Sequence, residues 1–176
     1  ELDRNLEMLK KFEFEQALEE SLEKLQEIIE QQEGLKKLND EKSQPQESIT
    51  EQQQELNKAF EKLSEKLDRL QQKNEELEKR ANLSDTDSLQ IKIEQQMQES
   101  KENSEKNKRK KTSQSQQKTL DQMEKLNEKL QQAQKQPGES GPSEDMDALR
   151  QILENLIDLS LEEEKLLSDL SKTNND

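Results

Sequence analysis

The amino-acid sequence predicts an all-α protein: elongated antiparallel helical hairpins, or a coiled coil, of four or five helices. Three observations carry this prediction. Ala, Glu, Lys, Leu and Arg supply about half of the 176 residues, a share typical of long helices and coiled coils. Only three Gly and three Pro interrupt the chain, and Val is absent, so little material remains for strands. Leucines recur at alternating spacings of three and four, which place them on one helical face.

The first expected helix runs from residue 2 to about residue 38. Its apolar stripe comprises Leu2, Leu6, Leu9, Phe12, Leu18, Leu22, Leu25 and Ile29. The polar sequence NDEKSQPQ at residues 39–46 ends this helix. Pro45 suits the start of the next helix, and Ser48 with Glu51 has the spacing of a capping box. The first two helices are therefore expected to form an antiparallel hairpin over residues 1–82.

The second expected helix, at about residues 45–82, has the clearest heptad pattern. Its coiled-coil seam consists of Leu56, Phe60, Leu63, Leu67, Leu70, Asn74 and Leu77. Asn74 is the one polar residue of this seam, and two interpretations of it are open. A buried Asn74 would fix the register of the packed helices and lower their stability. Alternatively, the seam ends there and Asn74 faces water.

Residues 83–136 are expected to form one long helix with a polar middle. Ser84 and Asp87 have the spacing of a capping box at its start. Its apolar stripe is Leu89, Ile93, Met97, Leu120, Met123, Leu126 and Leu130, and no apolar residue lies between residues 98 and 119. No Gly or Pro interrupts this segment, which as a helix would span roughly 75 Å. We expect a weakly stabilised helical spacer that bends between residues 111 and 117.

The last part of the chain is expected to be a linker at residues 137–142 and an amphipathic helix with a tail at residues 143–176. The linker lies within the sequence QPGESGP, which holds two of the three Gly and two of the three Pro. The apolar residues of the helix cover an arc of roughly 220°, wider than a two-helix seam. Those assigned to partner binding are Leu149, Ile152, Leu153, Leu156 and Ile157. Two interpretations are open: the helix is the centre of a small bundle, or it docks on a partner.

Composition argues against several functional classes. Cys and His are absent, which removes thiol chemistry and the usual ligands of zinc, copper and haem. No carboxylate pair stands out among 42 Asp and Glu residues, and there is no Gly-rich phosphate loop. We therefore expect no enzymatic activity, no cofactor and no metal. No apolar run reaches the roughly 18 residues of a transmembrane helix, so a soluble segment is expected. The chain begins within an apolar stripe and without Met, as a fragment of a longer protein would.

A basic run at residues 106–111 is the one candidate for nucleic-acid binding. Its cations are Lys106, Lys108, Arg109, Lys110 and Lys111. Glu102 and Glu105 each precede a cation of the run by four residues, the favourable order for ion pairs along a helix. No aromatic residue beyond Phe60 is present to stack on bases, and a net charge of −14 opposes nucleic acid. A nucleic-acid-associated coiled coil is therefore the alternative to a structural role.

Two stretches carry a resemblance to a known family. They are LDRNLEMLKKFEFEQALEE at residues 2–20 and DMDALRQILENLIDLS at residues 145–160, separated by a Gln- and Lys-rich segment that contains Met. In this order they resemble the helical middle region of a family of large, uncharacterised, membrane-anchored, Gln-rich bacterial proteins of the domain-of-unknown-function type. The resemblance implies a membrane-tethered bacterial parent and brings no catalytic or binding residues. The expected role is scaffolding through helical faces that bind a protein partner or another copy.

Overall fold

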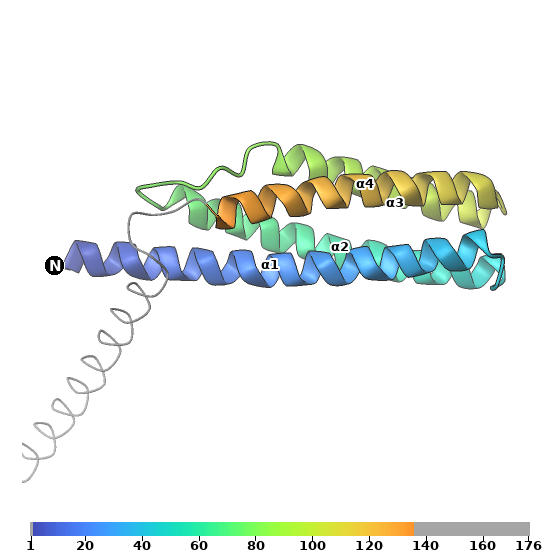
Figure 1. Ribbon diagram of the computed structural model, residues 1–176, viewed down its shortest axis with the longest axis horizontal. Coiled ribbons are helices and arrows are strands. Elements are labelled where there is room, and N and C mark those ends of the chain that lie inside the picture. Colours follow the sequence, from blue (N-terminus) through green and yellow to red (C-terminus); the bar gives the residue numbers. More distant parts are fainter. Residues whose placement is uncertain (1, 136–176) are drawn as a thin grey trace, which may run out of the picture. The chain divides into compact units, whose positions relative to one another are not determined.

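Four α-helices make up most of the chain between residues 2 and 135, the part that the computed structural model describes; residues 1 and 136–176 lie outside it. The helices are α1 (Leu2–Asp40), α2 (Gln46–Glu75), α3 (Thr86–Glu105) and α4 (Arg109–Gln134). They alternate in direction, so that α1 with α2 and α3 with α4 form two antiparallel hairpins (Figure 1). The predicted all-α hairpin architecture is confirmed.

The bundle corresponds to one compact unit, Phe12–Gln136. Residues 2–11, the first turns of α1, belong to a second unit whose other part lies outside the described residues. The expected linker at residues 137–142 and the expected amphipathic helix at residues 143–176 also lie outside the described residues.

The expectation of one long helix over residues 83–136 is wrong. The helix α3 ends at Glu105, and α4 begins at Arg109 and runs back beside it. The ion pair between Lys129 of α4 and Asp85 at the start of α3, with 3.8 Å between Nζ and Oδ2, marks the antiparallel pairing. The chain turns at residues 106–108, ahead of the expected bend at residues 111–117, where α4 is continuous.

The α1–α2 connection and the α3–α4 turn at residues 106–108 lie at the same end of the bundle (Figure 1). The helices that precede them, α1 and α3, end in the same motif. Asn107 has a positive φ of 53°, its N–H donates to Ser104 O, and the next N–H, of Lys108, donates to Asn103 O. Lys42 has the same φ after α1, with the equivalent bonds from Lys42 N to Asn39 O and from Ser43 N to Leu38 O. Both are Schellman motifs, which satisfy the last carbonyl groups of a helix. Neither motif was evident from the sequence, because a Schellman motif usually has Gly at the left-handed position, where this chain has Lys42 and Asn107.

Both capping boxes expected from the sequence are also wrong. The helix α2 begins at Gln46 with Pro45 as its N-cap, so Ser48 already lies inside the helix. The helix α3 begins at Thr86 after Asp85, and neither helix has a side-chain cap. The Pro45 ring fixes φ near −60°, which starts α2 without a capping side chain. The N-terminus of α2 is therefore set by its backbone.

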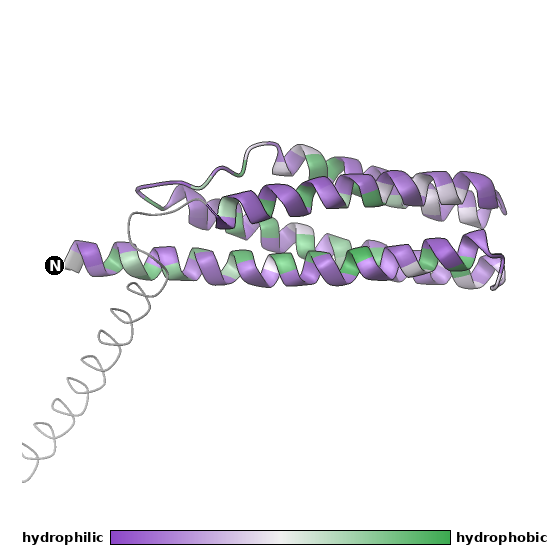
Figure 2. Ribbon diagram, viewed as in Figure 1, coloured by the Kyte–Doolittle hydropathy of each residue, from purple (hydrophilic) through white to green (hydrophobic). Residues whose placement is uncertain are grey.

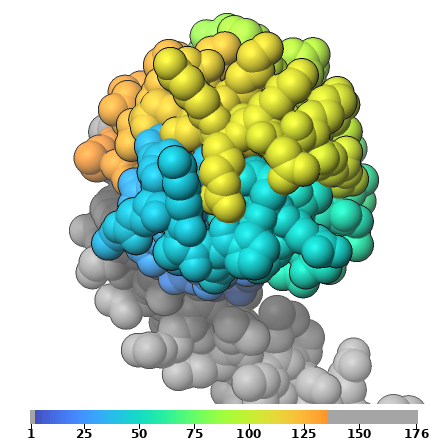
Figure 3. All heavy atoms as spheres, turned by 90° about the vertical axis from the view of Figure 1, so that its right-hand side faces the viewer, coloured from blue at the N-terminus to red at the C-terminus, as the bar shows by residue number. Residues whose placement is uncertain are grey.

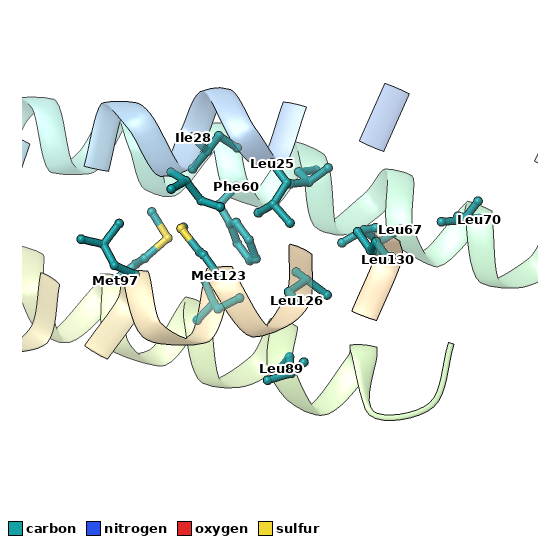
Figure 4. Close-up of a cluster of buried hydrophobic side chains, with 14 of the residues drawn as sticks. Leu25, Ile28, Phe60, Leu67, Leu70, Leu89, Met97, Met123, Leu126 and Leu130 are labelled. Atoms are coloured by element: carbon teal, nitrogen blue, oxygen red, sulfur yellow. The ribbon is translucent and has the colours of Figure 1, made fainter. Parts of the chain in front are cut away.

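On α3 and α4, buried apolar residues lie in the half of the bundle away from the 106–108 turn, whereas α1 and α2 also bury Leu35 and Ile49 near that turn. Figure 2 shows apolar residues along α1 and α2, whereas on α3 and α4 they gather towards the end opposite that turn. Phe60 of α2 is fully buried, and Figure 4 shows Leu25 and Ile28 of α1 and Met97 and Met123 of α3 and α4 around it. All four helices thus contribute to one apolar core.

The four-helix arrangement changes which α1 residues are buried. Of the predicted stripe, Leu18, Leu25 and Ile29 are buried, Phe12 and Leu22 are half-buried, and Leu6 and Leu9 are exposed. The buried set also includes Phe14, Ile28 and Leu35. A helix that packs on more than one neighbour buries a wider face than a single seam. The prediction from a narrow stripe therefore missed part of the core.

Candidate interaction site

The predicted coiled-coil seam of α2 faces the interior of the bundle. All seven seam residues are buried: Leu56, Phe60, Leu63, Leu67, Leu70, Asn74 and Leu77. The seam also extends towards the N-terminus through Gln46, Ile49 and Gln53, which keep the spacing of three and four and are buried as well. Buried residues at this spacing are the mark of coiled-coil packing. The seam is therefore longer than its apolar part.

Asn74 fits neither interpretation offered by the sequence. Its side chain is buried, so it does not face water. Its Nδ2 donates to the Ala81 carbonyl over 2.9 Å, and its Oδ1 accepts from the Ala81 N–H over 2.7 Å. These two bonds join the last turn of α2 to the connection between α2 and α3. Asn74 therefore fixes a loop rather than the register of two helices.

A layer of buried polar side chains crosses the bundle at Gln53. Gln32, Gln53, Ser100 and Gln116, one residue from each helix, form this Gln53 layer, and none of them is exposed to solvent. Gln53 Oε1 accepts hydrogen bonds from Gln32 Nε2 (3.1 Å), Ser100 Oγ (3.0 Å) and Gln116 Nε2 (3.1 Å). Gln53 Nε2 donates to Gln32 Oε1 over 2.9 Å. One amide group thus connects all four helices.

A second group of polar residues lies between the Gln53 layer and the turns. Gln46 Nε2 and Thr50 Oγ1 of α2 both donate to Ser104 Oγ of α3, over 2.8 and 2.7 Å. Ser104 Oγ in turn donates to the Gln46 carbonyl over 3.3 Å. Two buried acceptors between the Gln53 layer and the turns, Gln46 Oε1 and Asn39 Oδ1, have no hydrogen-bond partner within the described part of the chain, and the same holds for Gln116 Oε1 in the layer.

Small side chains in the polar half let α3 and α4 approach closely. The backbones of α3 and α4 lie close together along their length. In this half of the bundle, the small buried residues of α3 and α4 are Ser100, Ser104, Thr112, Ser115 and Thr119. The distance between packed helices depends on the size of the side chains at their contact. Residues 98–119, which contain no apolar residue and were expected to form a helical spacer, therefore form a packed interface between α3 and α4.

Reciprocal hydrogen bonds join the two turns at this end of the bundle. Arg109 at the start of α4 donates from Nη1 to the Asn39 carbonyl (3.3 Å) and from Nη2 to the Gln44 carbonyl (2.6 Å). Asn39 Nδ2 donates back to the Arg109 carbonyl over 3.1 Å. The guanidinium group presents several donors in a fixed plane, which suits two carbonyl groups at once. Arg109 thus connects the first hairpin to the second.

Asp40, the last residue of α1, is a titratable group close to α4. Partial burial alone would raise the pKa of its carboxyl group, but hydrogen bonds from Lys36 and Ser113 and the charge of Lys36 outweigh this effect. The pKa of Asp40 is consequently lower than its ordinary value. Lys36 lies on α1 and Ser113 on α4. The Ser113 hydroxyl of α4 therefore lies near the Asp40 carboxylate of α1 and favours its ionised form.

The structure disperses the five cations of the predicted nucleic-acid candidate. Lys106 pairs with Glu102 at 3.5 Å, as its spacing predicted, whereas Glu105 pairs with Lys101 at 3.8 Å instead of Arg109. Arg109 is half-buried between the turns, and Lys108, Lys110 and Lys111 are exposed. The run is the α3–α4 turn and the first turn of α4, so it forms no continuous helical stripe. Nucleic-acid binding at these residues stays a prediction.

Exposed large apolar residues are few in the described part of the chain. They are Leu6 and Leu9 on α1, which are 52% and 46% exposed, and Ile91 on α3, which is 55% exposed. Leu6 and Leu9 lie three residues apart on one face of α1, whereas Ile91 stands alone. The predicted partner-binding residues Leu149, Ile152, Leu153, Leu156 and Ile157 lie outside the described residues.

Neither a metal cluster nor a membrane-spanning helix is found between residues 2 and 135. No three side chains of His, Cys, Asp or Glu are grouped there so as to hold a metal ion. None of the described helices combines the length and the apolar character needed to cross a membrane. Comparisons with protein-family models, with curated proteins and with solved structures found no match to the chain.

The Gln53 layer is the feature that sequence reasoning missed, although a signal for it exists. On α1 the buried residues Leu18, Ser21, Leu25, Ile28, Gln32, Leu35 and Asn39 alternate by three and four without a break. On α4 the series Thr112, Gln116, Thr119, Met123, Leu126 and Leu130 does the same. The polar members continue the heptad register of the apolar ones. A search for heptads that counts Ser, Thr and Gln would have found them.

Proposed function

We propose that the chain is a non-catalytic scaffolding segment that mediates helix–helix protein interactions. The observation that supports this proposal best is the Gln53 layer, in which one amide group is hydrogen-bonded to side chains from the other three helices. A buried polar residue that needs specific partners disfavours other registers, because a shifted helix would leave it unpaired. A bundle held in one register keeps its outer helical faces at fixed spacing, which is what a scaffold requires.

The segment belongs, in this proposal, to a larger membrane-tethered bacterial protein. The basis for this part is the resemblance of residues 2–20 and 145–160 to the helical middle region described above. The tether would lie outside the described helices, because none of these is able to span a membrane. The segment itself acts through its helical surfaces.

Two apolar faces are the proposed contact sites for a protein partner or another copy of the chain. One is the exposed pair Leu6 and Leu9 on α1. The other is the set Leu149, Ile152, Leu153, Leu156 and Ile157, whose heptad-like spacing suits a helical partner. Neighbouring exposed apolar side chains on one helical face can bury their surface against a second helix. The two faces are tested separately.

Light scattering after size-exclusion chromatography, over a range of concentrations, tests the proposal. We expect Leu6→Ser with Leu9→Ser, and Ile152→Asp with Leu156→Asp, each to reduce self-association or capture of a helical partner. Ile91→Ser is the matched control, because it removes an equally exposed but isolated apolar side chain from α3. If both double variants assemble like the control and keep the stability of the parent chain, helical faces are not the contact sites and the proposal fails.

A further inference from the structure

The end of the bundle that carries the two turns is cationic, although the chain is acidic. Residues 36–47 and 101–111, which form this basic end, hold nine Lys and Arg side chains and five Asp and Glu side chains. They therefore carry an excess of four positive charges in a chain of net charge −14. Figure 3 looks onto this end, where the side chains around both turns form a rounded surface.

Ion pairs within the basic end neutralise specific lysines and leave others without a partner. Four of its carboxylates pair with neighbouring lysines: Lys36–Asp40 (2.7 Å), Lys37–Glu41 (4.0 Å), Lys101–Glu105 (3.8 Å) and Lys106–Glu102 (3.5 Å). Arg109 is bound to backbone carbonyl groups. The cations left without an ion pair in the described structure are Lys42, Lys108, Lys110 and Lys111, and all four are exposed. Glu47, also exposed, is the one carboxylate of this end outside these pairs.

The fold gathers these four lysines from segments far apart in the sequence. Lys42 lies in the α1–α2 connection, and Lys108, Lys110 and Lys111 lie in the α3–α4 turn and the first turn of α4. The Arg109 bonds to Asn39 and Gln44 hold the two connections together. The cluster therefore exists only in the folded bundle, and the run at residues 106–111 is only part of it.

The composition of the basic end indicates which anionic surface it fits. Protein interfaces are built around aromatic and apolar side chains and are depleted in Lys, but none of the exposed large apolar residues lies here. No aromatic residue follows Phe60 in the chain, so bases have no stacking partner. A bilayer with anionic headgroups needs neither feature, because lysine side chains meet mobile charges on a broad surface. We propose that the basic end docks peripherally on an anionic lipid surface, without insertion.

Acidic residues elsewhere in the bundle do not prevent this docking. At physiological salt, interactions between exposed charges are screened beyond about 8 Å. The helix α2 has 30 residues and is therefore about 45 Å long. Carboxylates beyond the first turns from the basic end lie more than one screening length from a surface that contacts this end. The proposal goes beyond the scaffolding role and does not rest on it.

Vesicle flotation of the full chain tests this proposal. The probe is a vesicle of phosphatidylcholine with about 30% phosphatidylglycerol, compared with pure phosphatidylcholine. Each lysine near an anionic surface contributes about a fivefold factor to binding, so four give a factor of several hundred. We expect binding to the anionic vesicles only, loss of binding on raising salt from about 0.05 to 0.5 M, and at least a hundredfold loss in a variant with Lys42, Lys108, Lys110 and Lys111 changed to Gln.

A variant of equal charge change provides the control. Lys58, Lys62, Lys92 and Lys125 are exposed, have no ion pair in the described structure, and lie on the sides of the bundle. Changing these four to Gln is expected to leave vesicle binding within about threefold, since they lie beyond the screening length. Three outcomes would overturn the proposal. The two variants could lose binding equally, the first variant could still bind, or the parent chain could fail to bind at low salt. A gel shift of duplex DNA that depends on the first four lysines, without vesicle binding, would assign the basic end to nucleic acid instead.

Discussion

Replacing Gln53 by Leu should destabilise the bundle even though the substitution makes the interior more apolar. The change removes the partner of four buried atoms on the other helices: Nε2 and Oε1 of Gln32, Oγ of Ser100 and Nε2 of Gln116. Leaving a buried donor or acceptor unpaired costs about 1–3 kcal/mol, so the lower limit for four atoms is about 4 kcal/mol. Burial of the Leu side chain offsets about 1.5 kcal/mol of this loss.

The expected net effect on the free energy of unfolding is therefore a decrease of about 2.5 kcal/mol. Urea unfolding followed by circular dichroism at the helical band measures it. With a slope of about 2 kcal/mol per molar urea, the midpoint should fall by about 1.2 M. Gln54→Leu is the matched control, because Gln54 is the exposed neighbour on the same helix, and it should change the free energy by less than about 0.5 kcal/mol.

A variant in which the whole Gln53 layer is apolar shows whether the destabilisation comes from unpaired buried groups or from the missing Gln53 amide itself. When Gln32, Gln53 and Gln116 are all replaced by Leu and Ser100 by Ala, no buried group is stranded, and stability should return to that of the parent or exceed it. If Gln53→Leu alone matches the Gln54→Leu control, the hydrogen bonds of the layer contribute nothing to stability and the reasoning is refuted.

Four further predictions concern the turns and the loop. Arg109→Gln removes the hydrogen bonds to the Asn39 and Gln44 carbonyl groups and should lower the free energy of unfolding by about 1–2 kcal/mol. The control Lys110→Gln, at an exposed position, should lower it by less than about 0.5 kcal/mol. Equal losses in the two variants, measured by urea unfolding, would contradict the role of the guanidinium group. Asn74→Ala should speed amide hydrogen exchange in residues 76–85 at least about tenfold, and unchanged exchange would show that its two bonds do not hold the loop. Lys42→Gly should raise stability by about 0.5–1 kcal/mol, because its φ of 53° is unfavourable for Lys, and a lower stability would exclude strain there. Because the pKa of Asp40 is lowered on folding, its contribution to stability is present above the ordinary pKa of this group and is lost as pH falls through the lower, folded-state value. The stability difference between the parent and Asp40→Asn should therefore be constant near neutral pH and shrink as pH falls below about 4, and a difference that stays constant in acid would contradict this.

The sequence predicted those parts of the fold that depend on apolar spacing within one helix. The seam from Leu56 to Leu77 could be identified because Leu and Phe at heptad positions have one plausible environment, the interior. The α1–α2 hairpin followed from two stripes of similar length on either side of a polar break. These features are local, so a single sequence contains them.

The polar half could not be predicted in the same way. Ser, Thr and Gln are compatible with solvent or with a buried layer, and only the partners on other helices decide between the two. Gln116 is buried because Gln53 accepts from it across 63 positions of sequence, a contact that no local pattern encodes. The absence of apolar residues at 98–119 therefore indicated a spacer, whereas the chain builds an interface of small residues there.

The turn at residues 106–108 was missed for a related reason. Gly and Pro are the usual marks of a helix end, and neither is present between Ser84 and Gln136. Asn107 takes the left-handed conformation instead, which Asn tolerates better than most residues. Arg109 then gains carbonyl partners on the other hairpin, so its role in the candidate site depends on the turn.

The most direct test of this account measures whether the polar tract folds back on itself. The chain has no Cys, so Lys92→Cys with Lys125→Cys provides two unique positions for spin labels, both exposed and lining the same groove between α3 and α4. In the hairpin, double electron–electron resonance should give a label separation below about 25 Å, consistent with neighbouring helices. A continuous helix would place the same positions about 50 Å apart, and that distance would contradict the bundle. Labels at Glu55→Cys and Glu75→Cys, within α2, should give about 30 Å in either case.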